Sequence, residues 1–96
     1  MGYHLEFNCL LSVPKTTLDL ATLETGKRYQ LVKEKERLYP LNIPIEICDD
    51  TYRYYGKVAV RKLTLEKGKT SLEIEVLKIF DANESAVYTK NFIKPE

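Results

Sequence analysis

The side chains best suited to chemistry lie in residues 52–57, which read Tyr-Arg-Tyr-Tyr-Gly-Lys and so interleave three aromatic rings with two cations. Rings of this kind can stack on the bases of single-stranded nucleic acid while the cations pair with phosphates. Tyrosine and arginine also dominate the binding energy of many protein interfaces. A third interpretation is structural, because tyrosine is a good strand former that tolerates half-burial. The segment leaves all three uses open.

A second group of cations and a tyrosine, residues 27–29, extends the same surface if the two strands are neighbours. The candidate binding residues are therefore Lys27, Arg28, Tyr29, Tyr52, Arg53, Tyr54, Tyr55 and Lys57. The whole chain has 15 Lys and Arg against 14 Asp and Glu, for a net charge of +1, so it is not a polybasic nucleic-acid binder. A neutral total can still contain a local Lys, Arg and Tyr face when the acids lie on another strand.

Catalytic chemistry has the least support. His4 is the single histidine, and strand alternation places it on the face opposite Cys9, so the two do not form a nucleophile–base pair. An enzyme acting through Cys48, Asp49 or Asp50 needs a cleft around them, whereas adjacent acids after a strand are typical of a turn. We therefore expect a protein that is not an enzyme.

Metal and cofactor sites are not predicted. The chain has one His, two Cys and no paired-cysteine or His-Glu-x-x-His motif, so no set of metal ligands converges. Neither of the glycine-rich phosphate-binding motifs occurs. Glu73 and Glu75 share a strand face, but Arg61, Lys62 and Lys57 are available opposite them, which favours cross-strand ion pairs over a catalytic carboxylate pair.

Cysteine usage and the N-terminal residues indicate the compartment. Two cysteines, no leader pattern in the first residues and no apolar run of membrane-spanning length are typical of free thiols in a reducing cytosol. We expect a cytoplasmic protein with no membrane contact.

The elements that position these residues follow a period of two, which is typical of half-buried strands. Expected strands cover residues 3–13, 27–32, 43–47, 56–66, 70–80 and, for a short last strand, 87–93. Lys67-Gly68-Lys69 between two β-branched runs predicts a β-hairpin. The change of apolar parity between Val60 and Leu63 predicts a bulge at Arg61–Lys62 that bends the hairpin.

Three further segments are less strand-like. Pro44 puts its strand at a sheet edge or leaves that one position unpaired. Residues 15–26 form either a short helix or an irregular loop, and Asp81–Glu84 is expected to be a loop. Together these patterns predict one domain over residues 1–96, all-β or mainly β with one short helix. Its fold is a small antiparallel barrel or rolled sheet of about six strands.

Some stretches of the sequence resemble those of known protein families. Residues 38–46 (Leu-Tyr-Pro-Leu-Asn-Ile-Pro-Ile-Glu), followed by 55–64 and then 69–72, resemble a family of short uncharacterised bacterial proteins, a domain of unknown function. That resemblance implies no catalytic residues. The Gly26-Lys27 and Gly56-Lys57 pairs before strands are similar to those of small PUA- and ASCH-type barrels, which often bind RNA.

The functional prediction is a small binding module. The first hypothesis is contact with a partner protein, or with further copies of the chain, through the tyrosine-rich segment or a sheet edge. The second is binding of RNA or single-stranded DNA on the local Lys, Arg and Tyr face.

Overall fold

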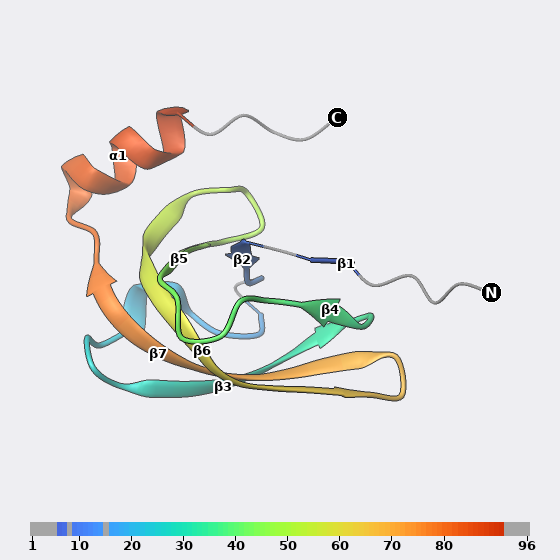
Figure 1. The fold of residues 1–96 in the computed structure, drawn as a ribbon. Helices are drawn as coiled ribbons and strands as arrows, with labels where there is room; N and C mark the ends of the chain where they lie inside the picture. The colour runs from blue at the N-terminus through green and yellow to red at the C-terminus, as the bar shows by residue number, and fades with distance from the viewer. Residues whose placement is uncertain (1–5, 8, 15, 92–96) are drawn as a thin grey trace.

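The computed structural model describes residues 6–7, 9–14 and 16–91 (Figure 1). In chain order its elements are β1 (Glu6–Phe7), β2 (Leu10–Ser12), the 3₁₀ turn η1 (Leu20–Thr22), β3 (Arg28–Glu34), β4 (Arg37–Leu38), β5 (Ile45–Cys48), β6 (Tyr54–Glu66), β7 (Lys69–Ile79) and α1 (Ala82–Asn91). The predicted mainly β fold with one short helix is confirmed. The predicted placement of His4 lies outside the described residues.

Five strands form one sheet in the order β2-β5-β6-β7-β3, and the sheet curls into a half-barrel (Figure 1). Its central pairs are antiparallel, as expected, but β2 runs parallel to β5, so the sheet is mixed. Parallel neighbours need a long crossover connection, which here contains η1, β3 and β4. β1 and β4 form a separate two-stranded parallel pair.

The predicted hairpin is the longest element pair of the fold. β6 and β7 are joined by Lys67 and Gly68, whose φ angles of 52° and 76° are both positive, as the type I′ turn favoured in two-residue hairpins requires. The predicted bulge is also confirmed, since Val60 pairs with Ile74 and Lys62 with Glu73, which leaves Arg61 as the extra residue. Bulges increase strand bending and twist, which helps the long hairpin to curl.

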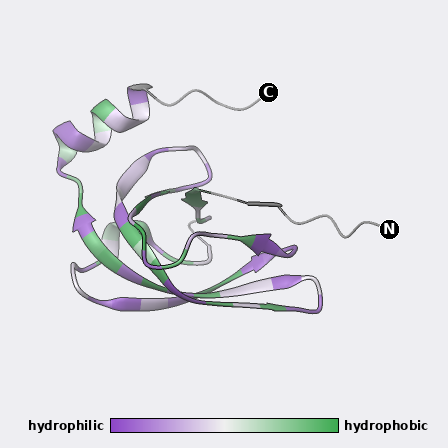
Figure 2. Cartoon of the chain, in the orientation of Figure 1, coloured by the Kyte–Doolittle hydropathy of each residue, from purple (hydrophilic) through white to green (hydrophobic). Residues whose placement is uncertain are grey.

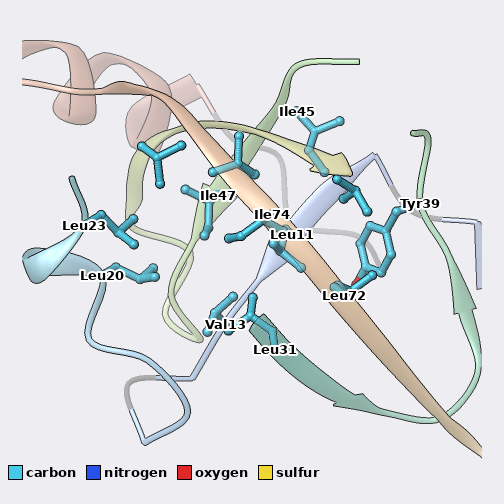
Figure 3. Packing of buried hydrophobic residues seen from close by; sticks show 13 residues of the cluster. Leu11, Val13, Leu20, Leu23, Leu31, Tyr39, Ile45, Ile47, Leu72 and Ile74 are labelled. Atoms are coloured by element: carbon cyan, nitrogen blue, oxygen red, sulfur yellow. The ribbon is translucent and has the colours of Figure 1, made fainter. Parts of the chain in front are cut away.

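The concave side of the curled sheet contains the main core. Figure 2 shows hydrophobic and hydrophilic residues alternating along the strands, which is the pattern of a sheet with one buried face. The buried cluster draws on strands from β2 to β7 and on η1 (Figure 3). It consists of Leu11, Val13, Leu20, Leu23, Leu31, Tyr39, Ile45, Ile47, Val58, Val60, Leu72, Ile74 and Val76.

A second, smaller cluster lies on the opposite side of the sheet, between its strands and α1. Neighbouring strand residues point to opposite faces, so Ile47 joins the main core while Cys48 joins this second cluster. Tyr54 and Phe80 are its other buried members, and Tyr88 of α1 packs against them. Figure 1 shows α1 outside the curl of the sheet.

The C-terminal part of the fold differs from the sequence prediction. Residues 82–91 are helical, so the expected loop at 81–84 and the start of the expected last strand are wrong. The helix begins with a reciprocal cap: the Glu84 N–H donates to Asp81 Oδ1 at 2.8 Å, and the Asp81 N–H donates to Glu84 Oε1 at 3.2 Å. This capping box was a helix-start signal in the sequence. The apolar residues after it suggested a strand instead.

The structure settles two open alternatives, one at Pro44 and one in the segment before β3. β5 lies inside the sheet, not at its edge, and it begins at Ile45, immediately after Pro44. The proline therefore removes no hydrogen bond from the ladder. Within the described residues 16–26, the short helix is confirmed at Leu20–Thr22, where the Asp19 side chain caps the turn by accepting from the Ala21 N–H.

Candidate functional site

The tyrosine-rich segment is shaped by a buried carboxylate just before it. Asp49 is 1% exposed, and its Oδ1 accepts hydrogen bonds from the Thr51 N–H at 2.9 Å, the Thr51 hydroxyl at 2.6 Å and the Arg53 N–H at 3.0 Å. These bonds close the turn in which Tyr52 takes a φ of 65°. The predicted turn role of the acidic pair is thus confirmed: Asp49 accepts the bonds that close the turn, and Asp50 lies exposed within it.

The two cysteines occupy different environments. Both are free thiols, Cys9 on the surface and Cys48 in the second cluster. Burial raises the pKa of the Cys48 thiol to about 11, so it stays protonated at neutral pH. A protonated thiol is a poor nucleophile, which disfavours covalent chemistry at this position.

Tyr54 connects the start of β6 to α1. Its ring is 6% exposed and lies 6.0 Å from the ring of Tyr88, which in turn stacks on Phe80 at 4.5 Å. The Tyr54 N–H donates to the Thr89 hydroxyl at 3.1 Å, and the Ser85 hydroxyl donates to the Tyr54 carbonyl. Burial raises the pKa of the Tyr54 hydroxyl to about 12. Most of the surface of Tyr54 is therefore used to hold the helix on the sheet.

The cations of the segment are arranged over aromatic rings. The Arg53 guanidinium lies 5.6 Å from the centre of the Tyr55 ring, and Lys57 Nζ lies 5.8 Å from the centre of the Tyr88 ring. Such cation–π contacts each contribute about 0.5–1 kcal/mol at exposed positions. Arg53 is the exposed side chain of this group, and it lines two shallow clefts that residues of α1 also line.

The other candidate residues belong to β3 and the turn before it. Lys27 pairs with Glu24 at 2.8 Å, and Arg28 pairs with Glu73 at 2.9 Å and Glu75 at 3.5 Å. The Tyr29 hydroxyl accepts a hydrogen bond from the Glu24 N–H, and its ring packs against the main core. β7 separates β3 from β6. Lys27 and Arg28 therefore form ion pairs with carboxylates, and β3 is not a neighbour of the strand that residues 52–57 lead into.

The sequence predicted contact through a sheet edge but did not say which strand provides it. One part of β6 is such an edge. β5 pairs with the first part of β6, and Leu41 adds a single bridge at Val60. From Lys62 to Glu66, β7 is the one strand partner of β6 within the described parts of the chain. We call these five residues the β6 edge. They belong to the closed end of the hairpin, which projects from the curl in Figure 1.

Along the hairpin, hydrogen-bonded pairs alternate with pairs that are not hydrogen-bonded. This alternation decides which N–H and C=O groups of the β6 edge are outward, that is, point away from β7. Glu66 and Lys69 flank the two-residue turn, and such flanking residues exchange both of their hydrogen bonds. Every second residue from Glu66 is therefore bonded to β7. The N–H and C=O groups of Leu63 and Leu65 point away from β7, into the space beside the sheet. Lys62, Thr64 and Glu66 are exposed, and the two leucines are half-buried.

The other ends of the sheet offer less room for a partner. β3 and β2 are its two terminal strands, and they approach each other where the Lys33 ammonium donates to the Ser12 carbonyl. That hydrogen bond joins the two terminal strands, whereas from Lys62 to Glu66 no described strand other than β7 pairs with β6.

The described residues contain neither a group of metal ligands nor a membrane-spanning helix. Within residues 6–7, 9–14 and 16–91, no three His, Cys, Asp or Glu side chains are grouped to hold a metal ion. In the same part of the chain, no helix has the length and apolar character that crossing a membrane requires.

The fold and these surfaces define a small β half-barrel with one helix packed outside it. No family model matches the chain, and no curated protein matches it. Among solved structures, the chain is similar to the crystal structure of protein ytmB from Bacillus subtilis, a target of the Northeast Structural Genomics Consortium. The two chains are 25% identical with a TM-score of 0.71, over 86% of this chain and 99% of ytmB. The likeness concerns the fold. The resemblances to a bacterial domain of unknown function and to PUA- and ASCH-type barrels stay predictions.

Proposed function

We propose that the protein is a protein-interaction module that binds an extended segment of a partner as an added strand at the β6 edge. The observation that carries this function is the row of outward N–H and C=O groups at Leu63 and Leu65. Such an edge is a template for pairing with another chain, and strand addition is a common mode of peptide recognition. The half-buried leucines and exposed Lys62, Thr64 and Glu66 would then select the partner's side chains.

The tyrosine-rich segment supports this function less well than the edge does. Tyr54 packs beneath α1 and Tyr55 packs against the main core, so little of their surface is free for a partner. Replacing Tyr54 by alanine would remove contacts inside the protein and would lower its stability by about 3 kcal/mol. Loss of partner binding in that variant would therefore not identify a contact.

Amide hydrogen exchange with an uncharged alternating threonine–valine octapeptide tests the proposed function. We expect the peptide to slow exchange at the amides of Leu63 and Leu65, because their hydrogens would be bonded to the added strand. Amides on the outward edge of β3, such as that of Val32, should be unaffected. Unchanged exchange at Leu63 and Leu65, both with the peptide and at high protein concentration, would contradict strand addition at this edge.

A matched pair of proline variants separates edge binding from general loss of structure. Leu65→Pro removes one outward N–H from β6 without removing a bond to β7. Val32→Pro does the same at β3, since the bond from the Val76 N–H to the Lys27 carbonyl indicates that Val32 also points outward. We expect Leu65→Pro to abolish the peptide effect and Val32→Pro to retain it. If both variants lost the slowing of amide exchange by the peptide, the loss would be a general effect of proline.

Single-stranded nucleic acid is a second candidate ligand, favoured by the two cation–aromatic pairs. Neither Arg53 nor Lys57 has a carboxylate partner among the described residues, so both charges are available to phosphates. The resemblance to RNA-binding barrels points the same way. We expect a labelled oligouridine to bind at low salt with an affinity that falls as salt rises. The double variant Arg53→Ala, Lys57→Ala should weaken it, and the control Lys67→Ala should not. Absence of binding at low salt would exclude this candidate.

A further inference from the structure

The β6 edge is complementary to itself when two copies run in opposite directions. Its residues read Lys-Leu-Thr-Leu-Glu from 62 to 66. If two such edges are paired around Thr64, Lys62 of each copy lies opposite Glu66 of the other. Leu63 then lies opposite Leu65, and Thr64 lies opposite Thr64. Opposite charges and paired apolar residues are the cross-strand combinations that stabilise antiparallel strands.

The backbone of the edge has the matching alternation. Because Leu63 and Leu65 carry the outward N–H and C=O groups, a register centred on Thr64 makes each Leu63–Leu65 pair a hydrogen-bonded pair. Leu63 of each copy pairs with Leu65 of the other, and this reciprocal pairing is what a twofold axis requires. Moving the centre to Leu63 or Leu65 would put Lys62 or Glu66 opposite Thr64, so the two charge pairs would be lost.

Lys62 and Glu66 have no ion-pair partner in the described part of this chain, although several other cations and carboxylates do. Arg61, for example, is used within the molecule, where it contacts Glu75 at 3.2 Å. Both charged residues at the ends of the edge are thus available for a contact between molecules. Isolated charges at an edge also discourage uncontrolled aggregation, which leaves a specific register as the favoured association.

We propose that the partner at the β6 edge is a second copy of this chain. Two half-barrels join through antiparallel β6 strands centred on Thr64, so that their sheets become one continuous sheet across a twofold axis. This inference rests on the proposed strand-binding function and names its partner. Five residues of edge make a small interface, so the dimer should be weak, with a dissociation constant in the micromolar range.

Sedimentation equilibrium of the full chain over a range of micromolar concentrations tests this proposal. We expect a reversible monomer–dimer equilibrium. Lys62→Glu should weaken the dimer by about tenfold or more, because both symmetry-related charge pairs change from attraction to repulsion. The double variant Lys62→Glu, Glu66→Lys restores both pairs and should return the dissociation constant to within about threefold of the original.

A charge-matched control and the peptide experiment separate the outcomes. Lys90→Glu changes the net charge equally but lies on α1, so it should leave the equilibrium unchanged. A monomer at every concentration, an equal effect of Lys90→Glu, or a double variant that stays as weak as Lys62→Glu would each overturn the dimer. If the chain is monomeric but the threonine–valine peptide still slows exchange at Leu63 and Leu65, the strand-binding function stands and its partner is another protein.

Discussion

Asp49 and Cys48 are adjacent in the chain, and each is buried for a different reason. The carboxylate of Asp49 replaces water with three donors from its own turn, which is how a charged group is held in the interior. Cys48 is the last residue of β5 and packs as a small apolar side chain under Tyr54. The carboxylate of Asp49 thus closes a turn, whereas the thiol of Cys48 fills space in a packed cluster.

The raised pKa of Cys48 predicts a loss of stability at alkaline pH. The unfolded thiol loses its proton near its ordinary pKa of 9.0, whereas the folded thiol keeps it until about 11. Between these values the folded state binds more protons than the unfolded state, so the free energy of unfolding decreases as pH rises. Below about pH 9 this contribution is fully present. Denaturant titrations at successive pH values measure the slope.

Two cysteine variants identify the group responsible. Cys48→Ala should make the slope between pH 9 and 10 clearly shallower, because Tyr54, whose ordinary pKa is 10.0, contributes less there than the thiol with its ordinary pKa of 9.0. Cys9→Ala should leave the slope as it is. A slope that persists unchanged in Cys48→Ala would show that another group is responsible for it.

The β6–β7 hairpin is the element that organises the fold, because it contributes to the main core, the second cluster and the free edge. Its local features agree with its tertiary role: alternating apolar residues, a two-residue turn and a bulge at Arg61. α1 was missed because Val87, Tyr88, Phe92 and Ile93 suggested a strand. The cap at Asp81 and the packing of Tyr88 under the helix decide the outcome instead.

Gly56 gives a prediction at the scale of this hairpin. A Cβ atom added there would lie 2.1 Å from the Lys78 carbonyl oxygen, so the backbones of β6 and β7 would have to separate. We expect Gly56→Ala to lower the free energy of unfolding by about 2–3 kcal/mol. In Gly68→Ala the added Cβ meets no atom within 4 Å, and the positive φ of the turn should cost about 1 kcal/mol.

Urea denaturation of both variants measures the difference. An equal or smaller effect at Gly56 than at Gly68 would contradict the close approach of the two strands.

At the scale of the whole molecule, one sheet supports two clusters on its opposite faces. β5 and β6 contribute to both, through Ile47 and Val58 on one side and Cys48 and Tyr54 on the other. Some charges form local pairs, such as those of Arg28 and Lys78 with neighbouring glutamates. Others, Lys62 and Glu66 among them, have no ion-pair partner in the described part of the chain and are available for contacts between molecules.

The shared strands predict that the two clusters unfold together. Tyrosine near-ultraviolet circular dichroism reports on ring packing in both clusters, including the stacked rings under α1, whereas far-ultraviolet circular dichroism reports on the sheet. We expect the two signals to give the same thermal midpoint in the native chain, since β5 and β6 cannot unfold without disrupting both clusters. Tyr88→Ala should lower both midpoints by several degrees. Separate midpoints in the native chain would show that α1 unfolds independently.

The sequence by itself determined the features that depend on near neighbours. Alternation defined most strands, Lys67 and Gly68 defined the hairpin turn, and the parity change after Val60 located the bulge. Each depends on residues a few positions apart, whose preferences are expressed before any distant contact forms. The turn at Asp49 was recognised for the same reason.

Only the tertiary structure decided the order of the strands and what each of them leaves exposed. That β2 runs parallel to β5, that β7 separates Arg28 from Arg53, and that the β6 edge beyond Lys62 is free all depend on which distant segments pair. Alternation shows that a strand has a buried face but does not identify its neighbours. The tyrosines therefore marked a region of interest from sequence alone, whereas the surface open to a partner was set by long-range strand pairing.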